Sequence, residues 1–212
     1  MSVWRLILAG MMFFAAAGVC MADDRTPEVL VKQTVQEVLD VIKQDKDIQQ
    51  GNNKKVRELV ESKVLPNFNF KHMTALAVGR SWNKASPQQQ DQLASEFRDL
   101  LVFTYSSALA NYRNQQVNYK PFKAKPGETD VVIKSVISQP GKEGIPIDYA
   151  LEKLADGWKV YDIVVSGVSL VTNYRETFLG EIRSGGIDGL IKSLVSKNRA
   201  LEQQMASKAD KR

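Results

Sequence analysis

The strand-rich middle of the chain constrains the fold most, because it holds more apolar side chains than one face of a sheet can bury. β-Branched residues and turn signals there predict an antiparallel four-stranded meander over 117–122, 129–138, 145–154 and 158–165. Side chains alternate between the two faces of a strand, yet the second and fourth strands have apolar residues on both faces. Two interpretations stay open: helices cover both faces around a solid core, or one face lines an apolar cavity.

Helical periodicity flanks this block on both sides. The motif TPE at 26–28 predicts a helix start with Thr26 as N-cap, and the capping box SPQQ at 86–89 opens the longest predicted helix. Further helices are expected over 56–65, 71–78, 168–181 and 187–206. The predicted fold class is α+β, with several helices packed on a four-stranded antiparallel sheet.

The N-terminal segment has the features of a cleaved signal peptide. Arg5 precedes an apolar run that is too short to span a bilayer, and small residues follow before the polar Asp23. A lipoprotein would be modified at Cys20, but the bulky Val19 before it suits that cleavage poorly. We expect residues 1–22 to be removed and residues 23–212 to form a single domain with a charged, frayed C-terminal tail.

The rare residues exclude several kinds of site. Cys20 is the only cysteine and His72 the only histidine, so the mature chain lacks the residues of a Cys/His zinc site and of a cysteine nucleophile. No Gly-rich phosphate-binding motif is present. The formal net charge of +5 is spread among acidic residues, which disfavours nucleic-acid binding. We expect no metal and no cofactor, and we expect His72 to be a surface or helix-end residue.

Three segments of the sequence together have the features of one protein family. They are LPNFNFKHMTALAVGRSWNKASPQQQDQLASEFRDLLVFTYSSAL from Leu65, WKVYDIVVSGVSLVTNYRETF from Trp158 and GIDGLIKSL from Gly186. The matching features within them are Gly79 with Trp82, Ser86-Pro87, Tyr105, Tyr161-Asp162, Gly167-Val168-Ser169 and Gly186-Ile187-Asp188-Gly189. Their order and spacing over about 29–194 resemble those of the periplasmic phospholipid carriers of the Mla system, the MlaC or toluene-tolerance family.

The resemblance implies a carrier in the periplasm of a Gram-negative bacterium, exported by a Sec-type signal peptide. Such a carrier moves phospholipid between an outer-membrane lipoprotein complex and the substrate-binding component of an inner-membrane ABC transporter, and so maintains the lipid asymmetry of the outer membrane. The family resembles the cystatin-like, cone-shaped folds, with acyl chains between sheet and helices. This implies the cavity interpretation, with phospholipid as cargo, no nucleic-acid partner and a monomeric chain.

Candidate lipid-binding residues come from three parts of the chain, and an ordinary core position is the alternative for each. The long helix and the sheet contribute Leu101, Tyr105, Leu109, Val132, Val136, Ile147, Tyr149 and Val164. The apolar run after Gly167 contributes Val168, Leu170, Val171 and Tyr174. Arg175 is a weaker candidate for a phosphate headgroup. The strand residues depend on register, since a shift of one residue exchanges the two faces.

Two other functions stay open as alternatives. Cystatin-like folds also include isomerases and dehydratases, which need an acid and a base in one apolar pocket. Tyr161 and Asp162 are neighbours on a strand and therefore point to opposite faces, as do Asp148 and Tyr149. We expect the chain not to be an enzyme. A lipid-free periplasmic adaptor is the third possibility.

Overall fold

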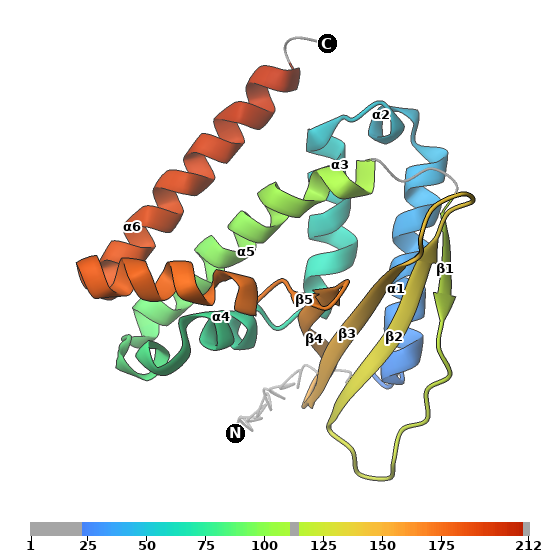
Figure 1. Cartoon of the computed structure of the whole chain (residues 1–212), viewed down its shortest axis with the longest axis horizontal. Helices are drawn as coiled ribbons and strands as arrows, with labels where there is room; N and C mark the ends of the chain where they lie inside the picture. The colour runs from blue at the N-terminus through green and yellow to red at the C-terminus, as the bar shows by residue number, and fades with distance from the viewer. Residues whose placement is uncertain (1–22, 111–114, 210–212) are drawn as a thin grey trace, which may run out of the picture.

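The structure is a computed structural model that describes residues 23–110 and 115–209. Helices and one antiparallel sheet make up the fold, which confirms the expected α+β class (Figure 1). The strands follow one another in space in their order along the chain. They are β1 (Gln116–Tyr119), β2 (Asp130–Ser138), β3 (Ile145–Leu154), β4 (Gly157–Val165) and β5 (Val168–Ser169). The first four correspond to the four expected strands, and β5 is an additional one.

Helices lie before and after the sheet in the sequence. The α-helices are α1 (Pro27–Gln44), α2 (Lys46–Gln49), α3 (Asn53–Leu59), α4 (Phe70–Val78), α5 (Pro87–Ala110) and α6 (Arg175–Ala209). A π-helical turn, Val60–Val64, follows α3. Three short 3-10 turns connect other elements: Leu65–Asn67, Gly79–Lys84 and Thr172–Tyr174. Helix α6 extends to Ala209, beyond the expected end at 206, and the charged, frayed tail stays a prediction. The expected signal peptide lies outside the described residues.

Both predicted helix starts are confirmed by their hydrogen bonds. Thr26 Oγ1 accepts a bond from the backbone N–H of Val29, at 3.3 Å. In the capping box, the Ser86 N–H donates to Gln89 Oε1 at 2.9 Å and the Gln89 N–H donates to Ser86 Oγ at 3.2 Å. These bonds satisfy backbone donors that have no partner within the helix.

The segment after β4 does not begin a helix at Val168, contrary to expectation. Ser166 and Gly167 both have positive φ, of 50° and 82°, which is the backbone of a two-residue hairpin turn of type I′. The chain therefore returns antiparallel to β4, and Val165 pairs with Val168. Asp162 stabilises this reversal, because its carboxylate accepts bonds from Ser169 Oγ at 2.6 Å and from the Val171 N–H at 3.3 Å.

A β-bulge interrupts the alternation of β4. Leu151 pairs with Val160 whereas Ala150 pairs with Asp162, so Tyr161 is an extra residue opposite β3. A bulge shifts the side-chain alternation by one position. On one face of the sheet, the side chains of β4 are therefore even-numbered before Tyr161 and odd-numbered after it. The sequence pattern alone did not indicate this change.

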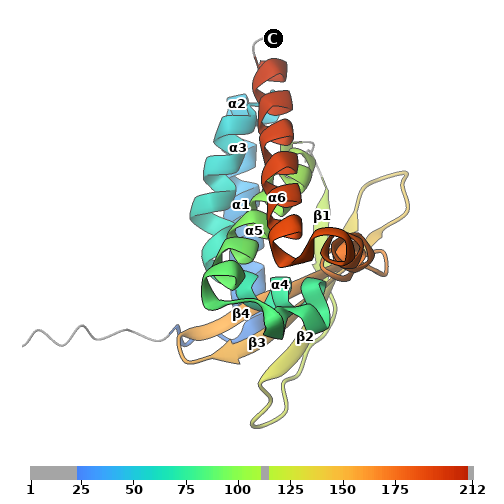
Figure 2. The same cartoon turned by 90° about the vertical axis from the view of Figure 1, so that its left-hand side faces the viewer.

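Three buried apolar clusters hold the elements together. One lies among α4, α5 and α6, around Phe97 and Phe178. A second joins α1 to β2, β3 and β4, around Leu30 and Ile133, and a third joins α1 to α2 and α3. In Figure 1, α1 lies next to the sheet and α6 lies at the far side of the molecule, and Figure 2 shows α6 in front when the molecule is seen from that side. The helical layer thus has solid cores of its own, separate from its contact with the sheet.

Helix α6 consists of two parts that meet at a bend, visible in Figure 1. Gly186 has φ 66° and ψ −166°, which is not helical, and the second part then begins near the expected residue 187. Only glycine adopts this backbone region without strain.

We expect Gly186→Ala to lower the free energy of unfolding by about 1–3 kcal/mol. Gly185→Ala is the matched control, because Gly185 lies in the helical part and an added Cβ would meet nothing within 4 Å. That control should leave stability equal or raise it by up to ~1 kcal/mol. Urea denaturation measures both, and equal losses for the two variants would contradict the bend as described.

Candidate functional site: an apolar cavity between helices and sheet

A cavity of about 640 Å³ lies between the helices and one face of the sheet, here called the inner face. The inner face includes Ile147 and Tyr149 of β3 and Val160 of β4. Opposite it, α1 contributes an apolar stripe at helical spacing, the π-helical turn contributes Val60 and Val64, and the last third of α5 completes the wall. The volume is within the range of about 300–1,000 Å³ that is usual for sites that bind small molecules.

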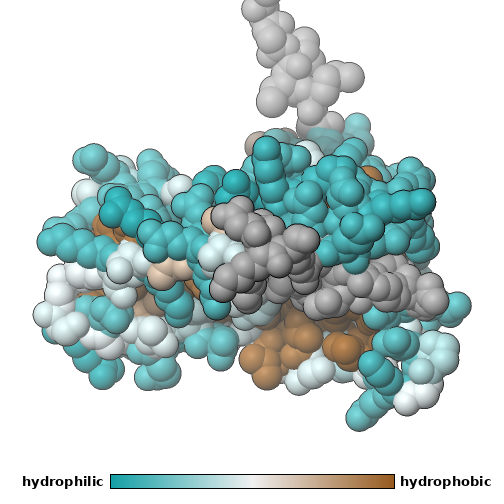
Figure 3. Space-filling model, turned by 90° about the horizontal axis from the view of Figure 1, so that it is seen from above, coloured by the Kyte–Doolittle hydropathy of each residue, from teal (hydrophilic) through white to brown (hydrophobic). Residues whose placement is uncertain are grey.

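The cavity wall is apolar along most of its length and polar at one end. Gln139, Lys142 and Glu143, in the turn between β2 and β3, line that end, here called the polar mouth. Seen from above, the molecule exposes an apolar patch within a mostly hydrophilic surface (Figure 3). Asn67, elsewhere in the wall, is paired with another lining residue: its Nδ2 donates to Thr34 Oγ1 at 3.1 Å.

Six of the candidate residues lie in the cavity wall. They are Leu101, Tyr105, Leu109, Ile147, Tyr149 and Leu170. They come from α5, β3 and the segment after β5, so the structure brings together three parts of the chain that the sequence suggested separately. Contact with a ligand remains a prediction for each of them.

Three strand residues were expected in the cavity wall and do not lie there. Val132 pairs with Ala150 and Val136 with Pro146, so both belong to the outer face, and Val132 is 42% exposed. The inner face of β2 holds Val131, Ile133 and Ile137 instead. Val164 is also absent from the wall, because the bulge at Tyr161 places Val160, Ile163 and Val165 on the inner face.

Four residues after the bend were also misplaced. Val168 lies in β5 and is 56% exposed. Val171 is fully buried in the cluster of α4, α5 and α6, and Tyr174 packs edge-on against Phe97 in the same cluster. The guanidinium of Arg175 donates to the backbone oxygen of Leu76 at 2.7 Å. Arg175 does not line the cavity. The common reason is the hairpin turn at 166–167, which delays the helix and changes the direction of these side chains.

Helix α1 and the segment that follows α3 also contribute to the cavity wall, which the sequence pattern did not indicate. Leu30, Val31, Val35, Val38 and Leu39 line the cavity. Their helical spacing predicted an apolar face but did not indicate what it faces. Phe68 and Phe70 also line the cavity, and Phe68 pairs with Val160 in an isolated parallel bridge.

The phenol groups at the cavity are held neutral. Burial raises the pKa of Tyr149, and a hydrogen bond from Ser135 offsets part of this effect. Burial, together with the neighbouring Tyr174, raises the pKa of Tyr105 to about 12. Among the described lining residues, Lys142 and Glu143 are the only ones with ionisable side chains other than tyrosine, and both are exposed at the polar mouth. The inner wall is therefore uncharged over the physiological pH range.

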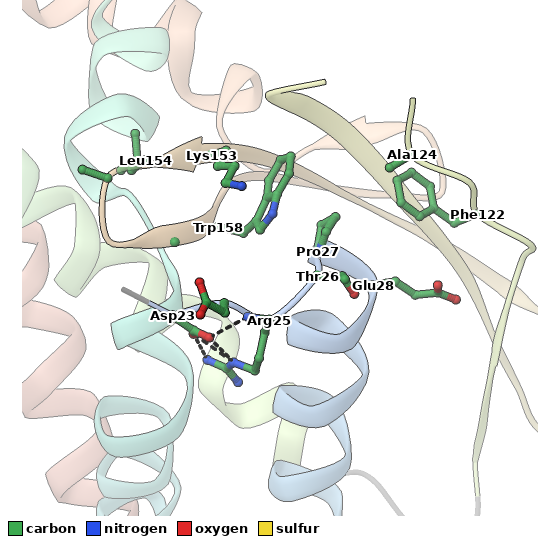
Figure 4. Close-up of a pocket in the computed structure, with 13 residues that line it drawn as sticks. Asp23, Arg25, Thr26, Pro27, Glu28, Phe122, Ala124, Lys153, Leu154 and Trp158 are labelled. Atoms are coloured by element: carbon green, nitrogen blue, oxygen red, sulfur yellow. Dashed lines mark hydrogen bonds and ion pairs between the residues drawn. The ribbon is translucent and has the colours of Figure 1, made fainter. Parts of the chain in front are cut away.

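A second hollow, of about 390 Å³, lies where the described chain begins (Figure 4). Arg25 Nε donates to Asp23 Oδ1 at 2.9 Å, and this bond lowers the pKa of the Asp23 carboxyl. The Asp23 N–H donates to the Asp156 carbonyl at 3.3 Å. A Cβ at Gly157 would lie 2.9 Å from Asp23. These contacts attach the N-terminal segment to the β3–β4 turn. The hollow therefore forms where this segment packs on the fold.

No group of three metal-ligating residues occurs within residues 23–110 and 115–209. His72 is in the first turn of α4, where its Nδ1 lies 2.8 Å from Glu152 Oε1 and its ring stacks on Tyr161, so the expected helix-end position is confirmed. No helix in the described part of the chain is long and apolar enough to cross a membrane.

Comparisons with known proteins agree with this architecture. The solved structure of the phospholipid-binding protein from Ralstonia solanacearum, determined in complex with a phospholipid, is similar with a TM-score of 0.76 and 45% sequence identity. The similarity covers 82% of this chain and 97% of that one.

Two named proteins are similar over most of their length. The intermembrane phospholipid transport system binding protein MlaC of Haemophilus influenzae is 25% identical over 171 residues, which is 79% of this chain and 80% of that protein. The toluene tolerance protein ttg2D of Pseudomonas putida is 26% identical over 165 residues, which is 77% of this chain and 76% of that protein. A sequence model of the MlaC protein family matches residues 32–196. The chain therefore belongs to the MlaC family.

Proposed function

We propose that this chain is a phospholipid carrier that encloses acyl chains in the apolar cavity and transports them through the periplasm. The cavity wall is the observation that supports this most directly, because α-helices, the π-helical turn and strands present apolar side chains to one cavity. The phospholipid bound by the relative from Ralstonia solanacearum supports the same cargo.

The energetics explain why such a carrier is needed. A phospholipid in water exposes on the order of 30 CH₂ groups, and each costs about 0.8 kcal/mol, so unassisted crossing of an aqueous gap costs more than ~20 kcal/mol. An apolar cavity removes most of this cost. The cavity must also release its cargo, so direction of transport depends on partners that distinguish loaded from empty carrier.

Membership of the MlaC family supports partners in the Mla system. These are an outer-membrane lipoprotein complex and the substrate-binding component of an inner-membrane ABC transporter. The sequence has no nucleotide-binding motif, so an ATP-driven step belongs to a partner. A signal peptide at residues 1–22 would direct export and then be removed, which places the mature chain in the periplasm of a Gram-negative bacterium. The mature chain is proposed to be a monomer.

Catalysis is not part of this proposal, because the described cavity lacks an acid–base pair. Glu143 is the one carboxylic acid in the described wall, and it is exposed at the polar mouth. Asp162 accepts hydrogen bonds at the turn after β4, and Asp148 forms an ion pair with Lys134 at 3.2 Å. Both carboxylates thus have structural partners away from the cavity.

Transfer between vesicles tests the carrier function directly. Donor vesicles contain a fluorescent phospholipid with a quencher, and acceptor vesicles contain neither. We expect the protein to raise the rate of transfer in proportion to its concentration, because the lipid crosses water inside the protein. An adaptor that binds no lipid would leave the rate at its background value.

A further inference from the structure

The cavity wall contains one buried hydroxyl that lacks a partner. Ser106 lines the cavity and is 3% exposed. Within the described part of the chain, its Oγ has no hydrogen-bond partner. Buried hydroxyls are nearly always hydrogen-bonded, because leaving one unpaired loses the bonds that it makes to water. The Ser106 hydroxyl is therefore available to a ligand.

Other buried polar groups at this cavity are satisfied by the protein. Asn67 lies between Thr34 and Arg25, with bonds of 3.1 Å and 3.3 Å, and Tyr149 is bonded to Ser135. Asn198 Oδ1 is the other buried side-chain atom without a partner in the described residues, and it lies outside the cavity. An unpaired hydroxyl is thus not a general property of the wall.

Ser106 lies in the part of α5 that is nearer the polar mouth. It is four residues before the end of α5 at Ala110, which corresponds to about 6 Å along the helix axis. Figure 1 shows this end of α5 at the same end of the molecule as the turn between β2 and β3, where Lys142 and Glu143 line the cavity. Deeper positions of α5, such as Leu101 and Val102, are apolar.

We propose that Ser106 Oγ donates a hydrogen bond to an ester carbonyl of the bound glycerophospholipid. This inference rests on the proposed function. In such a lipid the ester groups lie between the phosphate and the acyl chains. When the chains fill the apolar wall and the phosphate lies at the polar mouth, the esters are at the level of Ser106. The hydroxyl then sets the depth of the lipid and favours ester-linked over ether-linked chains.

Competition between two lipids tests this contact. The protein is stripped of lipid and offered an equimolar mixture of diacyl and dialkyl phosphatidylethanolamine with chains of equal length, and native mass spectrometry counts each complex. We expect the wild type to prefer the diacyl lipid by about three- to tenfold, as one net hydrogen bond predicts. Ser106→Ala should bind the two nearly equally, and Ser106→Thr, which keeps the hydroxyl, should retain the preference.

Thr74→Val is the matched control, because Thr74 is fully buried outside the cavity and its hydroxyl donates to the Phe70 carbonyl at 2.6 Å. It should keep the lipid preference and melt below the wild type, whereas lipid-free Ser106→Ala should melt at or above the wild type. Equal binding of both lipids by the wild type, or a preference that survives in Ser106→Ala, would overturn the contact and leave the carrier function intact. Failure of the wild type to bind either lipid would overturn the proposed function itself.

Discussion

Ile147→Trp and Leu109→Trp are each expected to remove most of the bound phospholipid from a protein that remains folded. The two side chains line the cavity from β3 and α5, so a larger ring at either position occupies space that acyl chains otherwise fill. The lipid-free variants should unfold within about 1 kcal/mol of lipid-free wild type, because the ring enters a space that the empty fold leaves open. Lipid must be removed before stability is compared, since a bound ligand raises apparent stability.

Val171→Trp is the control for overpacking. Val171 is fully buried in the cluster of α4, α5 and α6 and does not line the cavity. The same substitution should lower its stability by about 1–3 kcal/mol or more, while each folded molecule still binds lipid. Phosphate analysis of lipid extracts and urea denaturation give the two measurements. If the Ile147 and Leu109 variants keep their lipid and lose stability as the control does, these side chains belong to a solid core.

Phe97→Ala is expected to cause the largest loss of stability among the single substitutions considered. The ring is fully buried and packs edge-on against Tyr174 and Phe178, with centroid distances of 5.3 Å and 5.2 Å. Deleting it should cost about 3–5 kcal/mol and lower the melting temperature by on the order of 10 °C. Phe97 does not line the cavity, so lipid bound per folded molecule should be unchanged.

Phe103→Ala provides the comparison on the same helix. Phe103 is only partly buried, and its ring lies 5.9 Å from the Arg57 guanidinium. The loss there should be about 1 kcal/mol or less, because Phe103 belongs to none of the three buried clusters and packs against a flexible side chain. Calorimetry of the lipid-free proteins separates the two values. Similar losses at the two positions would show that the cluster around Phe97 is not the main core of the helical layer.

Local features of the fold were predictable because their signals act over a few residues. The helix start at Thr26 and the capping box at Ser86 depend on side chains that bond to nearby backbone groups. Glycines with positive φ mark the turns after β2 and β3: Gly141 lies between β2 and β3, and Gly157 begins β4. Local signals were not sufficient for the segment after β4, where a helix was expected and β5 is found. Val168 to Tyr174 is apolar enough for either structure, and the turn at 166–167 decides between them.

The cavity wall was predictable only in part, because it depends on contacts between distant segments. The choice of Val132 and Val136 failed since the face of β2 is set by its pairing with β3. The choice of Val164 failed because a single extra residue, Tyr161, reverses the alternation of β4. The stripe of α1 was visible in the sequence, but its packing opposite β3 and β4 requires the folded chain.

Native mass spectrometry of the exported protein, purified without added lipid, distinguishes a phospholipid carrier from a protein that binds no lipid. We expect a chain that begins at Asp23 with no lipid attached covalently, and a second species heavier by the mass of a phospholipid. Organic extraction should release that phospholipid, and a protein emptied in this way should take lipid from vesicles again. A spectrum that shows only the empty chain, together with no uptake from vesicles, would contradict the carrier function.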